Sequence, residues 1–425
     1  MQSYINPFII YKLITFVTMN INPIVLSIPI YFLLIGIELL IQQFSNKKMY
    51  RYNDAVTNIS CGITQQLSGT FLKIFGIGIY QYIYENFAIF RIESNLLTII
   101  ALFILVDFFY YWAHRMSHEI NLFWGSHVVH HQSEDYNFSV ALRQSSFQTI
   151  WTSVFYIPLA VVGFNTLDFA LMAALTTVYQ FWIHTETIKK LGWLEYIFNT
   201  PSHHRVHHGR DPKYIDKNHA GVFIIWDKWF GTFQKEEEKP TYGITKPINS
   251  WNPIWANFDH YQNMLSEMKN MSFKNQVKYL FKKPGWLPDE LGGLRKVESI
   301  NKDSFHKYET KSPSKINIYI LFQYALALAA SGLFLFNRAQ FTMNESVLFA
   351  SLITITLVNC GALFENKNWV KVAENIRILI FSGIAFYFSF INQWDPLLLI
   401  GGGAYLLISL TWLNTATISK VATHA

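Results

Sequence analysis

The sequence predicts an all-α, polytopic membrane protein with a histidine-rich region at its cytoplasmic face. Three observations lead to this class. Of the 425 residues, 51% are hydrophobic and 15% are charged, which exceeds the apolar share of ordinary globular domains. Several apolar runs reach the about 20 residues that a helix needs to cross a bilayer. Ten of the 14 histidines lie between residues 114 and 208.

Seven segments are expected to form long membrane helices. They are residues 23–44, 66–83, 96–113, 316–336, 346–364, 374–392 and 396–414. Residues 148–183 form a further apolar block, which we expect to consist of two shorter helices with a turn at "GFNTLD". Asn165 would cap the second helix, and Asp168 would lie in its first turn. The two cysteines lie far apart in apolar runs and predict no disulfide framework.

Four regions follow from this pattern. They are N-terminal membrane helices (1–95), a histidine-rich catalytic region (96–291), a polar linker (292–315) and a C-terminal region of four membrane helices (316–425).

Basic residues indicate the orientation in the membrane, because they are enriched on the cytoplasmic side. Lys47, Lys48 and Arg51 follow the first span, and 21 of the 34 lysines and arginines lie in residues 184–315. All histidine clusters are therefore predicted to be cytoplasmic. The membrane would be the endoplasmic reticulum in a eukaryote or the inner (plasma) membrane in a bacterium. The net charge of +6 fits an anionic membrane surface, and nothing indicates nucleic-acid binding.

Three histidine clusters carry the strongest functional signal. The string "HRMSH" places His114 and His118 four residues apart, which is one face of a helix. "HVVHH" and "HRVHH" place three histidines each at positions i, i+3 and i+4, again on one face. These are His127, His130 and His131 in the second cluster and His204, His207 and His208 in the third. Together the eight imidazoles could surround two metal ions.

The ligand type narrows the choice of metal. Neutral imidazole suits iron, copper, zinc and nickel, whereas a structural zinc site needs only four ligands and is usually cysteine-rich. Histidine-only coordination at a membrane surface therefore predicts a di-iron centre that activates O2. A metal transporter would instead place polar ligands near the membrane midplane. A haem protein would need single histidines that face each other within the bilayer.

Four further residues have more than one interpretation. His184 is either a ninth ligand or a histidine that reaches toward water at a helix end. His203 could bind metal, hydrogen-bond a ligand or lie at the surface. Asp107, a carboxylate within a span, could accept a hydrogen bond from a ligating imidazole or pair with a neighbouring helix. Glu119 is either a catalytic base or an exposed helix-end residue.

The three clusters, in their order between membrane spans, resemble the fatty acid hydroxylase and sterol desaturase superfamily of membrane di-iron oxygenases. The strings "DFFYYWAHRMSHEINLFW", "NTPSHHRVHHGR" and "IDKNHAGVFIIWDKWFGTF" resemble the alkylglycerol monooxygenases more narrowly. In that family, the residue at His219 is expected to be aromatic in the animal proteins. The role of His219, as a metal ligand or as a partner of one, is therefore left open.

The resemblance implies a reaction on a membrane lipid. The family hydroxylates the carbon beside the ether oxygen of an alkylglycerol, and the hemiacetal collapses to a fatty aldehyde and glycerol. The implied requirements are two iron ions, O2 and an electron donor, which in the animal enzyme is a reduced pterin (tetrahydrobiopterin). The same iron site also serves desaturation and hydroxylation. A sterol desaturase or a fatty acyl hydroxylase of membrane lipids is therefore the alternative.

Overall fold

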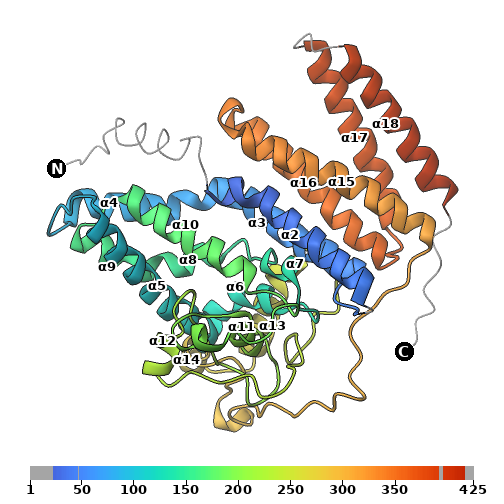
Figure 1. The fold of residues 1–425 in the computed structure, drawn as a ribbon. Coiled ribbons are helices and arrows are strands. Elements are labelled where there is room, and N and C mark those ends of the chain that lie inside the picture. The colour runs from blue at the N-terminus through green and yellow to red at the C-terminus, as the bar shows by residue number, and fades with distance from the viewer. Residues whose placement is uncertain (1–22, 46, 392–395, 417–425) are drawn as a thin grey trace. The chain divides into compact units, whose positions relative to one another are not determined.

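The computed structural model describes residues 23–45, 47–391 and 396–416 (Figure 1). Over these ranges the chain contains helices and loops but no β-strand. Two isolated β-bridges, Phe198–Phe223 and Gly209–Tyr242, lie in the loops of the histidine-rich region. The predicted all-α class is therefore confirmed.

Helices follow one another along most of the chain. Up to residue 300 the α-helices are α2 (Pro23–Ser45), α3 (Tyr52–Lys73), α4 (Ile79–Phe87), α5 (Leu96–Glu119), α6 (Asn121–His131), α7 (Phe138–Ala141), α8 (Gln148–Thr152), α9 (Ile157–Val162), α10 (Thr166–Trp182), α11 (Pro201–His207), α12 (Ile225–Trp229), α13 (Trp255–Met268) and α14 (Phe273–Phe281). They are followed by α15 (Ser314–Phe336), α16 (Met343–Phe364), α17 (Val370–Ile391) and α18 (Pro396–Thr415).

The chain divides into two compact units. The first comprises Met1–Ile248 and Ala256–Lys307, and the second comprises Asn249–Trp255 and Tyr308–Ala425. All three histidine clusters lie in the first unit. The short segment 249–255 belongs with the C-terminal helices, because Glu365 accepts hydrogen bonds from the hydroxyl of Ser250 at 2.8 Å and from the backbone N–H of Trp251 at 2.5 Å.

Four helices are long and apolar enough to cross a membrane. They are Leu26–Ser45, Leu96–Glu119, Ser314–Phe336 and Met343–Phe364, which confirms a polytopic membrane protein. The predicted span 66–83 is helical, but a π-helical turn at Ile74–Gly78 divides it between α3 and α4. The predicted spans 374–392 and 396–414 are helical and coincide with α17 and α18, apart from residue 392, which lies outside the described residues. Neither helix is among the four candidate spans found in the described residues.

Polar residues in the first half of helix α3 contact the histidine-rich region. Asp54 is buried and accepts hydrogen bonds from Asn58 at 2.8 Å and from Ser133 at 2.6 Å. A buried carboxylate requires such partners. The polar first half of α3 therefore packs inside the protein.

The apolar block 148–183 folds as predicted into two helical segments joined by a tight turn. The first runs from Gln148 to Val162, and the second is α10. Gly163 has a φ of +119°, and a Cβ there would overlap the carbonyl of Phe90, so glycine is required. Asn165 accepts a hydrogen bond from the backbone N–H of Asp168 at 2.9 Å, which confirms the predicted cap.

Helix α5 carries the first histidine cluster at its C-terminal end. Its apolar part packs with α4, α9 and α10 around a core in which Leu102 and Val106 are fully buried. Tyr80 and Phe169 stack in the same core with ring centroids 4.2 Å apart. Helices α5 and α10 lie side by side (Figure 1). This packing holds the histidine-bearing end of α5 in a defined position.

The second unit contains a buried polar network that joins its four long helices. Arg377 of α17 donates to both carboxylate oxygens of the buried Glu374, at 2.6 and 2.8 Å. Arg377 also donates to Gln323 of α15 at 2.8 Å and to Thr356 of α16 at 3.1 Å. Tyr405 of α18 donates to the same Gln323 oxygen at 2.9 Å. Each charge thus has several partners, as a charge pair inside an apolar bundle requires.

We expect the substitution Arg377→Met to destabilise the second unit strongly. It leaves Glu374 buried without its cation, and breaking such a pair costs about 3–5 kcal/mol. The thermal unfolding midpoint of the detergent-solubilised protein should fall. The double variant E374L/R377M, which removes both charges, should recover part of the loss. An unchanged midpoint in R377M would show that the network contributes nothing to stability.

Candidate metal centre

Nine histidines converge inside the first unit. They come from α5 (His114, His118), α6 (His127, His130, His131), the loop after α10 (His184), and α11 with the residue that ends it (His204, His207, His208). All are buried, none more than 6% exposed. They form a five-histidine group (His114, His118, His127, His131, His207) and a four-histidine group (His130, His184, His204, His208). Within each group the candidate ligand atoms lie within 4.8 Å of one another.

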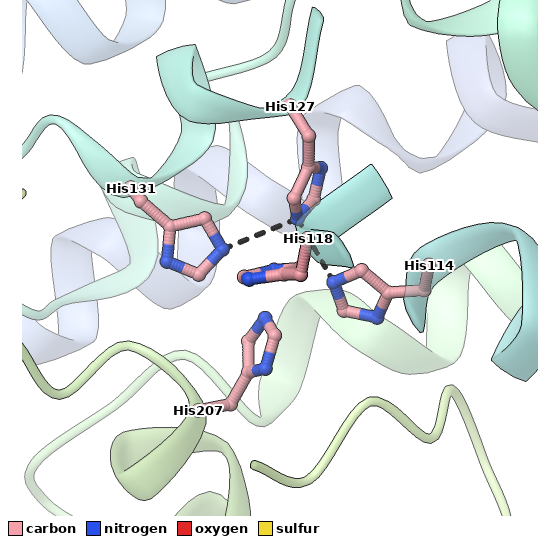
Figure 2. Close-up of side chains that lie close together, drawn as sticks. All are labelled: His114, His118, His127, His131 and His207. Atoms are coloured by element: carbon pink, nitrogen blue, oxygen red, sulfur yellow. Dashed lines mark hydrogen bonds between the residues drawn. The ribbon is translucent and has the colours of Figure 1, made fainter. Parts of the chain in front are cut away.

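The rings of the five-histidine group point toward one another (Figure 2). Nε2 of His127 lies 2.9 Å from Nε2 of His114 and 3.1 Å from Nε2 of His131. Two nitrogens bound at right angles to one ion, each at about 2.1 Å, would be about 3.0 Å apart. The observed separations therefore match neighbouring ligands of a single metal ion.

The four-histidine group has the same spacing. Nε2 of His184 lies 3.1 Å from Nε2 of His130 and 3.0 Å from Nε2 of His204. The ring of His208 lies 4.5 Å from that of His130, between centroids. The structure therefore brings His184, one of the residues with two interpretations, into a group of candidate ligands.

Backbone carbonyls orient four of the nine rings. Nδ1–H donates from His114 to His219 (2.7 Å), from His130 to Arg143 (3.0 Å), from His184 to Gln180 (2.7 Å) and from His207 to Lys217 (2.9 Å). An imidazole that donates through Nδ1 keeps a lone pair on Nε2, the atom that faces its group. The fold therefore sets the tautomer that metal binding requires.

Burial also keeps these imidazoles neutral. It lowers the pKa of His130 to about 4, and it lowers the pKa values of His131, His207 and His208 well below their usual range, with neighbouring imidazoles adding to the effect. Neutral imidazole is the metal-binding form.

Unpaired nitrogens give a direct test of whether the donor set fits a metal. Nε2 of His118, His207 and His208 has no hydrogen-bond partner in the described part of the chain. Buried polar atoms without a partner are rare, and a metal ion would supply one. The donor set thus fits metals that bind imidazole, iron among them.

Comparison with known proteins identifies the family. The fatty acid hydroxylase family model matches residues 99–232, a range that contains all nine histidines. Alkylglycerol monooxygenase from Homo sapiens is 39% identical over 358 residues, which cover 83% of this chain and 80% of that protein. The chain belongs to the alkylglycerol monooxygenase family.

Further relatives of the same name agree with this assignment. Alkylglycerol monooxygenase from Xenopus tropicalis is 37% identical over 355 residues, covering 83% of this chain and 79% of that protein. Alkylglycerol monooxygenase from Danio rerio is 34% identical over 376 residues, covering 87% of this chain and 83% of that protein. No solved structure matches the chain significantly.

In this alkylglycerol monooxygenase family member, Asp107, for which two roles were open, contacts a loop and no ligating imidazole among the described residues. Its buried carboxylate accepts hydrogen bonds from the backbone N–H groups of Val222 (2.7 Å) and Phe223 (3.0 Å) and from the indole of Trp226 (2.9 Å). A Cβ at Gly221 would lie 2.6 Å from Asp107 Oδ1, so glycine permits this close approach. Asp107 therefore fixes a loop against α5.

Asp227 is a positioning residue that the sequence analysis missed. Its oxygens accept from the backbone N–H groups of His219 and Ala220, both at 2.8 Å, and from the hydroxyl of Thr232 at 2.6 Å. Burial raises the pKa of Asp227 to about 6. It holds the backbone of His219, whose carbonyl orients His114. The sequence did contain a signal for this role: an aspartate within the aromatic string "WDKWFGTF" suggests a buried carboxylate, and a buried carboxylate needs hydrogen-bond donors.

Arg143, in the string "ALRQS", supports the second cluster in a similar way. It is buried and donates to the carbonyl of Val129 at 2.7 Å and to the side chain of Gln132 at 2.7 Å. Its own carbonyl accepts from His130. Arg143 therefore ties the C-terminal end of α6 to the loop that orients a candidate ligand.

Glu119 and His203 lie outside both groups. Glu119 ends α5, is partly exposed and pairs with Arg115 at 2.9 Å, contacts that favour its interpretation as a helix-end residue. The ring of His203 packs against Phe233 with centroids 5.4 Å apart, and among the described residues it touches no ring of either group. Of the three roles left open for His203, ligation is not supported because it lies in neither group, and a surface position is not supported because the residue is buried.

His219 borders the five-histidine group. Its ring is fully buried, with its centroid 5.0 Å from that of His118. Burial lowers the pKa of His219 to about 3, and an interaction with the backbone of Asp216 offsets only part of this shift. The sequence left its role open, and the structure places it beside candidate ligands.

A polar cavity of about 380 Å³ lies next to the four-histidine group. Its lining includes charged residues of both signs, among them Lys48, Glu134, Lys239 and Lys302. Tyr136 and Tyr242 also line it and stack with ring centroids 4.9 Å apart. The ring of Tyr136 lies 5.3 Å from that of His208, so Tyr136 separates the cavity from the group.

Proposed function

We propose that this chain is a di-iron monooxygenase that cleaves the ether bond of alkylglycerols. The observation that carries the proposal is the division of nine buried imidazoles into two groups, each suited to one metal ion, in a chain of the alkylglycerol monooxygenase family. The substrate class comes from the name of the relatives, and the iron comes from the resemblance together with the all-imidazole donor set.

The reaction requires O2 and a source of electrons. Iron, when bound, supplies the activation of O2, which amino-acid side chains cannot provide. One oxygen atom enters a C–H bond beside the ether oxygen of the lipid, and the other leaves as water, with two electrons and two protons consumed. The hemiacetal proton then moves to the glycerol oxygen as the C–O bond breaks, which releases a fatty aldehyde and glycerol. The electron donor is a reduced pterin or another two-electron donor.

The chain's own residues would hold the two ends of the substrate. Leu97, Ile100 and Ile104 of α5 expose apolar side chains along a candidate membrane span, where alkyl chains lie. The polar cavity next to the four-histidine group suits a hydrated glycerol headgroup. Tyr136, between the cavity and the group, would mark the position of the ether carbon.

A product assay tests this function. Membranes from cells that express the protein should convert a 1-O-alkylglycerol to a fatty aldehyde, with O2 and a reduced pterin present, as detected by mass spectrometry. The ester-linked acylglycerol of the same chain length is the matched control and should not release aldehyde. Turnover of neither lipid, in protein shown to contain iron, would contradict the proposed substrate class.

Lipid hydroxylation without cleavage is the second candidate. The ornithine lipid hydroxylase OlsE of Rhizobium tropici is 29% identical over 143 residues, which cover 31% of this chain and 40% of that protein. Lipidomics of the same membranes would reveal hydroxylated acyl chains in place of aldehydes if this activity were the main one. The sterol desaturase alternative would appear there as new sterol double bonds.

We also propose that the histidine groups face the cytoplasm, in the endoplasmic reticulum or the bacterial inner membrane. The enrichment of basic residues in 184–315 supports this orientation. A cysteine introduced at the exposed Lys235 should react with an impermeant maleimide only after the cytoplasmic side is opened. The two native cysteines are buried and should give little background. Labelling of intact cells would contradict the proposed orientation and place the histidine groups on the opposite side of the membrane.

A further inference from the structure

His219 adjoins three candidate ligands of the five-histidine group. Its ring centroid lies 5.0 Å from that of His118, 5.6 Å from His207 and 5.7 Å from His114. These separations fall within the 4.4 to 6.4 Å found between rings inside the group. The nitrogens of His219 nevertheless lie outside the set of five that share the 4.8 Å limit. His219 thus borders the group without belonging to it.

Unpaired nitrogens gather on this side of the group. In the part of the chain that the structure describes, Nε2 of His118 and of His207 forms no hydrogen bond. The ring of His219 interacts with the backbone of Asp216, but neither of its nitrogens forms a hydrogen bond of normal geometry. The three rings adjoin one another, since His118 and His207 are themselves 4.8 Å apart between centroids. Such buried polar atoms are costly unless a partner is present. A metal ion in the five-histidine group would satisfy His118 and His207, so His219 is the ring at this edge whose nitrogens would still need a partner.

The backbone of His219 is held on both sides. Asp227 accepts a hydrogen bond from its N–H at 2.8 Å, and its carbonyl accepts from Nδ1 of His114 at 2.7 Å. Moving the ring into the ligand set would disturb a bond that orients His114. The geometry therefore favours a ring that serves the group from outside over a sixth ligand.

We propose that His219 hydrogen-bonds a small exogenous molecule that would bind to the metal ion held by the five-histidine group. This inference rests on the proposed function, because it requires a metal ion in that group. The molecule would be water, a small anion or O2, each of which can pair with an imidazole nitrogen. His219 therefore acts as a binding residue for a small molecule beside the five-histidine group.

Azide binding to the iron-loaded, detergent-solubilised protein tests this role. Azide is titrated while its charge-transfer absorption is followed, and iron per chain is measured in parallel by mass spectrometry. We expect His219→Phe to weaken azide binding about tenfold or more, because a hydrogen bond to a charged partner is lost. His219→Gln, which keeps a donor, should retain part of the affinity. His203→Phe is the matched control and should bind azide within about twofold of wild type.

The iron measurement separates the outcomes. About two irons per chain in every variant, with weaker azide binding only in the His219 variants, would support the proposal. Full iron content with wild-type azide binding in H219F would overturn it. Loss of iron from H219F and H219Q would also overturn it, because His219 would then be a ligand. Absence of iron from the wild-type protein would refute the proposed function itself.

Discussion

Replacing His207 by alanine is expected to remove the metal ion of the five-histidine group and to reduce activity at least about a hundredfold, since even the loss of a group that supports a ligand costs 10- to 100-fold. His207 contributes an Nε2 without another partner in the described structure, and its Nδ1 is fixed by the carbonyl of Lys217. Iron per folded chain, measured by mass spectrometry after size exclusion, should fall from about two toward one.

His130→Ala should have the corresponding effect on the four-histidine group. His130 lies 3.1 Å from His184, Nε2 to Nε2, so its loss removes a neighbouring ligand. Both variants should remain in the membrane, because the spans are stabilised by their own apolar surface. His306→Ala is the control, since His306 is exposed and in neither group. Wild-type iron content in both H130A and H207A would contradict the assignment of metal to these groups.

Asp107→Ala is expected to destabilise the first unit and to lower its metal content. The substitution leaves three donors without their acceptor, namely the buried N–H of Val222 and indole of Trp226 and the partly buried N–H of Phe223. Each unpaired buried donor costs about 1–3 kcal/mol, so the total loss should be at least about 3 kcal/mol. The thermal unfolding midpoint and the iron content should both fall, because the loop held by Asp107 continues from His219.

Glu119→Ala on the same helix is the matched comparison. Glu119 pairs with Arg115 near the surface, and such a pair contributes about 0–1 kcal/mol. We expect near-normal stability, iron content and activity in this variant. If E119A lost activity at full iron content, the catalytic interpretation of Glu119 would be restored. If D107A behaved like E119A, the loop anchored by Asp107 would not be needed for the site.

The sequence by itself determined the class of the protein and the identity of most candidate ligands. Apolar runs of bilayer length predict membrane helices because the bilayer core offers no partner for polar groups. Helical spacing places His127, His130 and His131 on one face, since residues three and four apart adjoin on a helix. These signals are local, so they can be read without knowing how distant segments pack.

Only the tertiary structure decided how the ligands are shared. His127 and His131 join the five-histidine group while His130, on the same helix face, joins the other. Likewise His204 and His208 fall in one group and His207 in the other. The division depends on where α5, α6, α10 and α11 meet, and helical spacing contains no information about which distant helix faces which residue.

The roles of the carboxylates and of His219 were also decided by long-range contacts. Asp107 and Asp227 contact the loop that begins at His219, and Asp107 lies more than 100 residues away from that loop in the chain. Because both carboxylates are buried, each needs hydrogen-bond donors inside the protein, and those donors reveal its role. Which residues become buried depends on how the helices pack. The sequence therefore drew attention to Asp107 and to the segment that contains Asp227, but it could not identify their hydrogen-bond partners.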